Sequence, residues 1–127
     1  MLEDRTIEVW AYNLETVLAE KLETVISRNV TNTRMRDFYD IYILQKLHGE
    51  QLKKQVLWNA LVATARKRGT LEQINSVDIR EIFDEIEISS VMENLWKTYQ
   101  KNYSYAADIS WHTIMKSICT LYGSMLK

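Results

Sequence analysis

The sequence predicts a mainly α-helical fold, a compact bundle of about six helices preceded by one short strand. Proline is absent and glycine occurs only three times, which argues against a turn-rich β architecture. Hydrophobic residues make up 46% of the 127 residues and charged residues 26%, so one folded core is expected. We divide the chain into a residual strand at 1–12 and a helical domain at 13–127.

The stretch "RTIEVWAY" near the start of the chain alternates in character from residue to residue. Ile7, Val9 and Ala11 form one side of this period-2 pattern, which is typical of a strand. A single strand is not stable alone. We expect it either to pair with a sheet that this chain does not supply or to be a remnant arm.

The first predicted helix begins at Asn13, which we assign as its N-cap, and ends before the break "NVTNT". The residues expected on its core-facing side follow i, i+3, i+4 spacing. They are Leu14, Val17, Leu18, Lys21, Leu22, Val25, Ile26 and Arg28. Two cations, Lys21 and Arg28, therefore stand among apolar residues, while the polar face is expected to carry Glu15, Glu23 and Ser27.

Five further helices follow from the same periodicity and from helix-end signals. One of them ends in "ARKRG", where the cations complement the helix dipole and Gly69 is the expected C-cap. Ser90 and Glu93 have capping-box spacing. The predicted ranges are 36–47, 51–68, a helix capped at Asn75 or Ser76 and reaching 86, 90–103 and 110–125.

Composition limits the classes of function. With 16 basic and 17 acidic residues the net charge is −1, which provides no general attraction to nucleic acid or anionic membranes. No signal-peptide pattern opens the chain, and no apolar run approaches the roughly 20 residues that cross a bilayer. The single cysteine, Cys119, excludes an internal disulfide and is expected as a buried core thiol. We expect a cytoplasmic protein without membrane contact.

Other residue clusters leave alternatives open. The aromatic run "WKTYQKNYSY" fits either core packing, which its helical spacing favours, or stacking on nucleic-acid bases. The "ARKR" run fits either a helix-terminal charge cluster, the favoured interpretation, or contact with a nucleic-acid backbone. His48 and His112 are far apart and no Cys/His pair has ligand spacing, so we predict no metal site.

The strongest candidate site combines the first helix with "TRMRDFYDIYIL". Asp37 and Asp40 share a helix face with apolar neighbours, and a short helical hairpin brings Arg28 near them, with Lys21 about two turns away. Lysine snorkelling and an Asp37 N-cap would explain the charges separately. Together they fit either a structural ion-pair network or the binding of phosphates and a divalent metal.

These residues also carry a resemblance. "YNLETVLAEKLETVISR" followed by "TRMRDFYDIYIL" resembles the C-terminal signature of AbiEii/AbiGii-type nucleotidyltransferases, toxin-like members of the DNA polymerase β-type superfamily. The resemblance implies that Lys21 and Arg28 bind nucleotide phosphates and that Asp37 and Asp40 belong to the active site. Asp37 is favoured as the catalytic carboxylate, Lys21 is also counted as catalytic, and Arg36 is expected to brace the nucleotide-binding cluster.

The sequence departs from the family pattern in one respect. Such enzymes begin with a Gly-Ser loop and paired metal-binding aspartates, whereas this chain has no Asp-x-Asp, and its only Gly-Ser lies at Gly123. We therefore expect a C-terminal helical portion that is inactive alone, with Mg²⁺ and NTP bound only by the complete enzyme. RNA as acceptor and an antitoxin protein are the implied partners. The alternative is a non-enzymatic helical interaction module, including a homodimer formed through the N-terminal strand.

Overall fold

A computed structural model of the chain describes residues 14–74 and 79–125. These residues form seven α-helices joined by short connections and 3₁₀ turns, and no strand occurs among them. The predicted mainly α-helical fold is therefore confirmed, whereas the predicted strand within 1–12 lies outside the described residues. The helices are α2 (Leu14–Arg28), α3 (Met35–His48), α4 (Lys54–Arg68), α5 (Leu71–Ile74), α6 (Ile79–Ile88), α7 (Ser90–Asn102) and α8 (Trp111–Met125).

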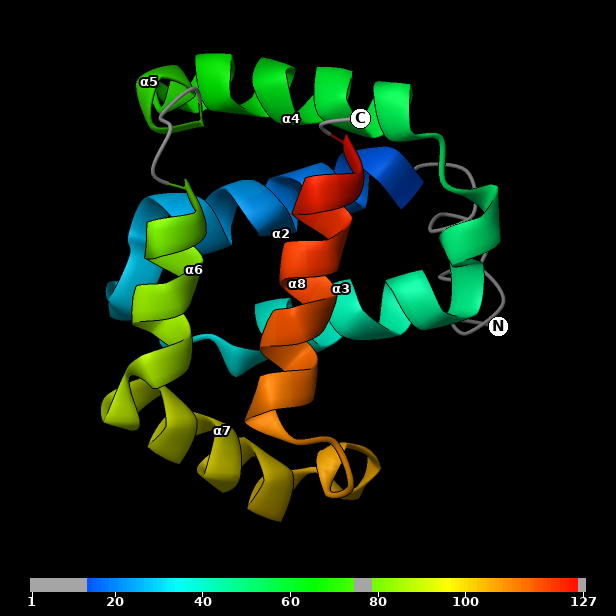
Figure 1. The fold of residues 1–127 in the computed structure, drawn as a ribbon. Helices are drawn as coiled ribbons and strands as arrows, with labels where there is room; N and C mark the ends of the chain where they lie inside the picture. Colours follow the sequence, from blue (N-terminus) through cyan, green and yellow to red (C-terminus); the bar gives the residue numbers. More distant parts are fainter. Residues whose placement is uncertain (1–13, 75–78, 126–127) are drawn as a thin grey trace.

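Helix α8 runs through the middle of the molecule and crosses α2 and α3 (Figure 1). It packs against α3, α4 and α6, while α2 packs against α3 on one side and α4 on the other. The core therefore lies where α2, α3, α4 and α8 meet. Its fully buried side chains include Leu18, Leu22, Phe38, Leu61 and Ile114.

Covering α2 from two sides buries more of its circumference than one apolar stripe would predict. Leu14, Leu18, Leu22 and Val25 are buried as expected, but Glu23 is also buried, at 1% exposure. The assignment of Glu23 to a solvent-facing polar side is therefore wrong. Because α4 packs over this side of α2, the carboxylate is enclosed and takes its partners from the end of α4.

The end of α4 follows the predicted C-cap. Gly69 has φ 76°, a left-handed conformation that a side chain would strain, and its N–H donates to the carbonyl of Arg66 at 3.3 Å. The N–H of Thr70 donates to the carbonyl of Ala65 at 2.8 Å. This turn directs Arg68 and Thr70 back toward α2.

The next segment differs from its prediction. Residues 71–74 form the separate short helix α5, and α6 begins at Ile79 in the described residues. The predicted helix, capped at Asn75 or Ser76 and reaching 86, does not include residues 71–74, so α5 was not predicted from the sequence. The predicted cap at Asn75 or Ser76 lies outside the described residues.

The structure corrects one predicted helix cap and excludes a second cap that the sequence left as an alternative. The N-cap of α7 is Ser89, whose Oγ accepts the N–H of Met92 at 3.2 Å, so Ser90 does not form the predicted capping box with Glu93. Helix α3 begins at Met35 with Arg34 as its N-cap residue, so Asp37 lies inside the first turn and is not the cap.

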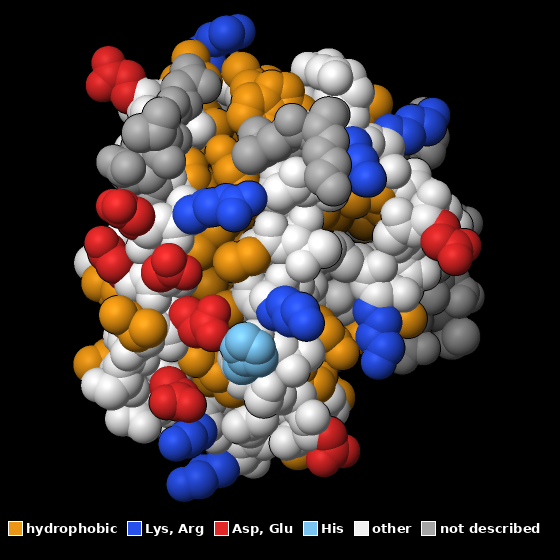
Figure 2. Space-filling view, in the orientation of Figure 1, with side chains coloured by type: hydrophobic (Ala, Val, Ile, Leu, Met, Phe, Trp, Pro, Cys, Tyr) orange, Lys and Arg blue, Asp and Glu red, His pale blue; other side chains and the backbone are white. Residues whose placement is uncertain are grey.

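The outer surface corrects the predicted burial of Cys119 and shows how charged side chains are distributed on one face. Cys119 is exposed rather than buried, because it lies beside, not within, the apolar stripe of α8 formed by Ile118 and Tyr122. On the face in Figure 2, acidic side chains gather over α6 while basic ones are scattered. This face therefore offers no continuous basic surface. Among the described residues no helix combines the length and apolarity needed to traverse a bilayer.

Candidate functional site

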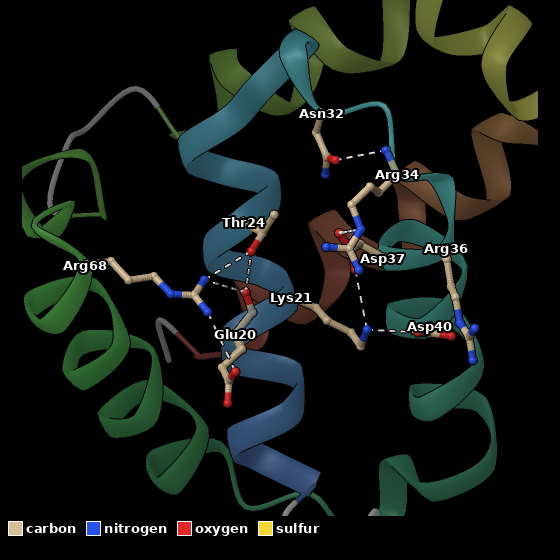
Figure 3. Close-up of polar contacts among 9 residues, drawn as sticks. All are labelled: Glu20, Lys21, Thr24, Asn32, Arg34, Arg36, Asp37, Asp40 and Arg68. Atoms are coloured by element: carbon tan, nitrogen blue, oxygen red, sulfur yellow. Dashed lines mark hydrogen bonds and ion pairs between the residues drawn. The ribbon is translucent and has the colours of Figure 1, made fainter.

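Lys21 reaches from the middle of α2 to two aspartates of α3 (Figure 3). Its Nζ atom lies 2.9 Å from Oδ2 of Asp40 and 3.5 Å from Oδ1 of Asp37. The side chains of Asp37 and Asp40 are 7% and 9% exposed, and that of Lys21 is 23% exposed. The lysine does not simply extend into solvent, because its charged tip is held between two nearly buried carboxylates.

The connector between α2 and α3 determines this pairing. Asn29 adopts φ 49°, and the buried Asn32 accepts the N–H of Arg34 at 3.0 Å through its Oδ1 atom. The chain thereby turns before α3 begins. The first turns of α3 come to lie beside the middle of α2, so Lys21 and not Arg28 faces the aspartates.

Each aspartate has an arginine on its outer side. Nε of Arg34 lies 3.9 Å from Oδ2 of Asp37, and Nε of Arg36 lies 3.7 Å from Oδ2 of Asp40. Both arginines are largely exposed, and such long, exposed ion pairs add little stability. Their guanidinium groups remain accessible to a ligand.

Arg28 does not join this cluster. It lies at the end of α2, it is exposed, and it forms no ion pair with another residue in the described ranges. The expected approach of Arg28 to Asp37 and Asp40, with Lys21 further away, is reversed in the structure.

A surface pocket of about 290 Å³ opens beside Lys21. Three cations from separate elements line it: Lys21 of α2, Arg34 of the connector and Arg68 of α4. Asp37 also lines this pocket, whereas Asp40 does not. The remaining lining residues are Val17, Glu20 and Thr24.

Arg68 is fixed by the buried Glu23. Nη1 of Arg68 pairs with Oε1 of Glu23 and donates to Oγ1 of Thr24 at 3.1 Å. The hydroxyl of Thr70 donates to the other oxygen of Glu23 at 2.7 Å. A guanidinium held by several partners is preorganised, so it loses less conformational freedom when it meets an anion.

Sequence reasoning did not place Arg34 and Arg68 at the site. Arg34 was visible in "TRMRD" and Arg68 in "ARKRG", and the latter cations do occupy the last turn of α4 as expected. No periodicity indicates that the end of α4 lies next to α2, because this proximity depends on how the helices pack.

The described residues do not supply a metal site. No group of three or more His, Cys, Asp or Glu side chains in residues 14–74 and 79–125 is arranged to hold a metal ion. Asp37 and Asp40 are each paired with Lys21 and an arginine, so their oxygens do not fit a two-metal centre. His112 instead contacts Glu87, with Nδ1 2.8 Å from Oε2.

The arrangement suits an anionic ligand. A lysine ammonium has three donors and no acceptor. Two donors point to Asp37 and Asp40, which leaves one for a ligand in the pocket. Lys21, Arg34 and Arg68 line the pocket together with Glu20 and Asp37, while the ion-pair partners Asp40 and Glu23 lie outside the lining. Phosphate oxygens are the ligands that such clustered cations bind best.

Comparison with known protein families identifies a match for this chain. The family model described as "Nucleotidyl transferase AbiEii toxin, Type IV TA system" matches residues 1–117 of the chain. No curated protein and no solved structure matches this chain. The family match spans α2 and α3 together with Arg68 of α4, and so includes every residue of the pocket described above.

Proposed function

Since this chain belongs to the AbiEii nucleotidyl transferase toxin family, we propose that its pocket binds the phosphates of a nucleoside triphosphate during nucleotidyl transfer. The single observation that carries this proposal is the convergence of Lys21, Arg34 and Arg68 on one pocket, from three separate elements. Three convergent cations suit a polyphosphate better than a singly charged ligand.

In the proposed reaction, an acceptor oxygen displaces pyrophosphate from the α-phosphorus of the nucleotide. Negative charge develops on the departing pyrophosphate, and the pocket cations stabilise that charge. Because Lys21 is already fixed by two carboxylates, little reorganisation is needed when the phosphates arrive.

We assign different roles to the two aspartates. Asp40 makes the shorter contact with Lys21 and does not line the pocket, so it acts as a positioning residue. Asp37 lines the pocket and makes the longer contact, so it is the carboxylate available to accept the acceptor's proton. Arg28, which the family resemblance assigns to phosphate binding, has no role in this pocket.

The complete activity needs further groups. The family resemblance implies Mg²⁺ held by paired aspartates, and the described residues do not supply that pair. We propose that this chain provides phosphate contacts to a site whose metal ligands come from elsewhere, and that it is inactive alone. An RNA acceptor and an antitoxin protein belong to the same proposal, the antitoxin because the family is a type IV toxin–antitoxin one.

Binding of sodium tripolyphosphate, measured by isothermal titration calorimetry, tests the pocket without requiring catalysis. We expect Lys21→Met and Arg34→Gln each to weaken binding by about tenfold, since each removes a charged hydrogen-bond donor. Lys97→Gln changes an exposed lysine of α7 outside the pocket and serves as the matched control. Equal affinity in all four proteins would contradict the proposal.

A transfer assay tests the catalytic role. The chain is mixed with a polypeptide that carries the Gly-Ser and Asp-x-Asp segments, and with Mg²⁺, labelled NTP and RNA. We expect incorporation of label with the parent chain and none with Lys21→Met. Transfer that survives Lys21→Met, or Mg²⁺-dependent transfer by the chain alone, would overturn the assignment.

A further inference from the structure

A ladder of aromatic rings leads from the core to the surface beside the candidate site. Trp96 of α7 is 1% exposed, and its ring is stacked on that of Tyr99, with centroids 5.3 Å apart at an interplanar angle of 18°. The ring of Tyr103 follows, with its centroid 4.6 Å from that of Tyr99. Tyr103 is 45% exposed, so the outer end of the ladder is open to solvent.

A second exposed ring stands next to the ladder. Tyr105 is 52% exposed, and its hydroxyl shares a hydrogen bond of 2.7 Å with the hydroxyl of Tyr99. The centroid of Tyr105 lies 5.5 Å from that of Tyr103 and 4.8 Å from that of Tyr39 on α3. Core packing, the favoured interpretation of this aromatic run, therefore holds for Trp96 but not for Tyr103 or Tyr105.

The segment that carries the two exposed tyrosines is held firmly on α7. Nε1 of Trp96 and Nε2 of Gln100 both donate to the carbonyl of Ile109 at 2.8 Å. Gln100 also donates to the carbonyls of Ala106 and Ala107 at 3.3 Å. The rings of Tyr103 and Tyr105 are thus presented in fixed positions, which lowers the entropic cost of stacking a ligand on them.

The ring of Tyr105 contacts that of Tyr39, the residue next to Asp40 in α3. Tyr39 and Arg36 are i, i+3 neighbours on α3, and Arg36 pairs with Asp40, which does not line the pocket. Burial is the main cause of the raised pKa of the Tyr99 phenol; the Asp40 carboxylate raises this pKa further and the Arg36 guanidinium lowers it. Figure 3 shows Arg36 and Arg68 on opposite sides of Lys21.

We propose that Tyr103 and Tyr105, with Arg36, bind the unpaired end of the acceptor RNA, the terminal base stacking on Tyr103 and a backbone phosphate meeting Arg36. This inference rests on the proposed function and names the surface that holds the acceptor. Any base can extend a ladder of rings, and stacking on an aromatic side chain is a main source of affinity for single strands. The donor triphosphate and the acceptor end then approach the two aspartates from opposite sides.

Fluorescence anisotropy of a labelled RNA hairpin tests this surface in the absence of NTP. The full 127-residue chain is titrated against a hairpin with an unpaired 3′ end and against the same hairpin with a blunt end. We expect the parent chain to prefer the unpaired end. Tyr103→Leu should weaken that binding by about tenfold, while Tyr103→Phe, which retains the ring, keeps it within about twofold.

Two controls separate this proposal from the proposed function. Val91→Ala alters an exposed residue of α7, 64% exposed, and should bind the RNA as the parent does. Tyr103→Leu should retain its affinity for tripolyphosphate, so a failed phosphate pocket and a failed RNA surface give different results. Circular dichroism melting verifies that each variant is folded.

Three results would overturn the inference. The first is equal affinity of the parent chain for the unpaired and blunt hairpins. The second is unchanged RNA binding by folded Tyr103→Leu. The third is a loss of NTP affinity in Tyr103→Leu with RNA binding intact, because the ring would then hold the base of the incoming nucleotide rather than that of the acceptor.

Discussion

The Nζ atom of Lys21 lies 2.9 Å from Oδ2 of Asp40, across the interface between α2 and α3. The same ammonium reaches Asp37, so one lysine compensates two carboxylates that are less than a tenth exposed. Enclosed charges are costly without a partner. This contact therefore links the stability of the α2–α3 pair to the group that we propose binds phosphate.

Removing the lysine should destabilise the fold. We expect Lys21→Met to lower the free energy of unfolding, measured with urea, by about 2 kcal/mol, because Asp37 and Asp40 remain enclosed without it. The double variant Lys21→Met/Asp40→Asn should lose less than the sum of the single variants, with a coupling of about 1 kcal/mol.

Arg28→Met is the matched control for this cycle, since it removes an exposed cation from the same helix. It should change the free energy of unfolding by less than about 0.5 kcal/mol. If Lys21→Met were as mild as Arg28→Met, the ion-pair cluster would have no structural role.

Glu23 should matter for stability far more than its neighbour Glu20. Both contact Arg68, but Glu23 is 1% exposed and also accepts from Thr70, whereas the side chain of Glu20 is 51% exposed. We expect Glu23→Ala to cost about 2 kcal/mol, because Arg68 and Thr70 lose a buried partner. Glu20→Ala should cost less than about 1 kcal/mol, as exposed pairs do.

Chemical denaturation of both glutamate variants provides the measurement, and tripolyphosphate binding adds a second one. If Glu23 fixes Arg68 for ligand binding, Glu23→Ala also weakens tripolyphosphate affinity, while a purely structural role leaves that affinity unchanged in the folded variant. Equal denaturation midpoints for Glu23→Ala and Glu20→Ala would contradict the burial of Glu23.

Helical periodicity was sufficient to predict most of the fold, because an amphipathic pattern reports which side of a helix is covered. It placed Lys21 among inward residues and Gly69 at a helix end, and the structure confirms the enclosed lysine tip and the left-handed glycine. It failed for Glu23, because a sequence pattern describes one helix and does not show that a second helix covers its other side.

The candidate site was predictable only in part for the same reason. Lys21, Asp37 and Asp40 were named from the sequence, and the structure brings them together. Whether Lys21 or Arg28 faces the two aspartates depends on the conformation of the connector between α2 and α3. That conformation includes the positive φ of Asn29, which the residue pattern does not specify. Arg68 reaches the site through helix packing, which has no local signal.

The assignment of Ser89 rather than Ser90 as the N-cap of α7 can be tested directly. Ser89 accepts the N–H of Met92 at 3.2 Å, while Ser90 is exposed in the first turn. We expect Ser89→Ala to lower the free energy of unfolding by about 1 kcal/mol, because a helix N–H loses its acceptor. Ser90→Ala is the matched control and should change it by less than about 0.5 kcal/mol. The opposite ranking in urea denaturation would restore the capping box at Ser90.

The tyrosine ladder should make stability fall at alkaline pH. Burial, reinforced by the hydrogen bond between the Tyr99 and Tyr105 hydroxyls, raises the pKa of Tyr99 well above its usual 10.0, and burial also raises the pKa of Tyr39 and Tyr122. Above pH 10.0 the unfolded chain releases these protons while the folded chain keeps them. The unfolded state then binds fewer protons, so this contribution to stability is complete below the unfolded pKa and is lost as pH rises toward the folded pKa.

The variant Tyr99→Phe isolates the contribution of the Tyr99 phenol to the pH dependence of stability from that of the other ionisable groups. The variant retains the ring but has no phenol at this position, so its melting temperature should fall less steeply than that of the parent as pH rises above 10.0. At neutral pH the variant should be slightly less stable, because Tyr105 loses its hydrogen-bond partner. The two melting curves should therefore converge with rising pH. Parallel curves would show that Tyr99 ionises equally in the folded and unfolded chains, in contradiction to its partly buried position between Trp96 and Tyr103.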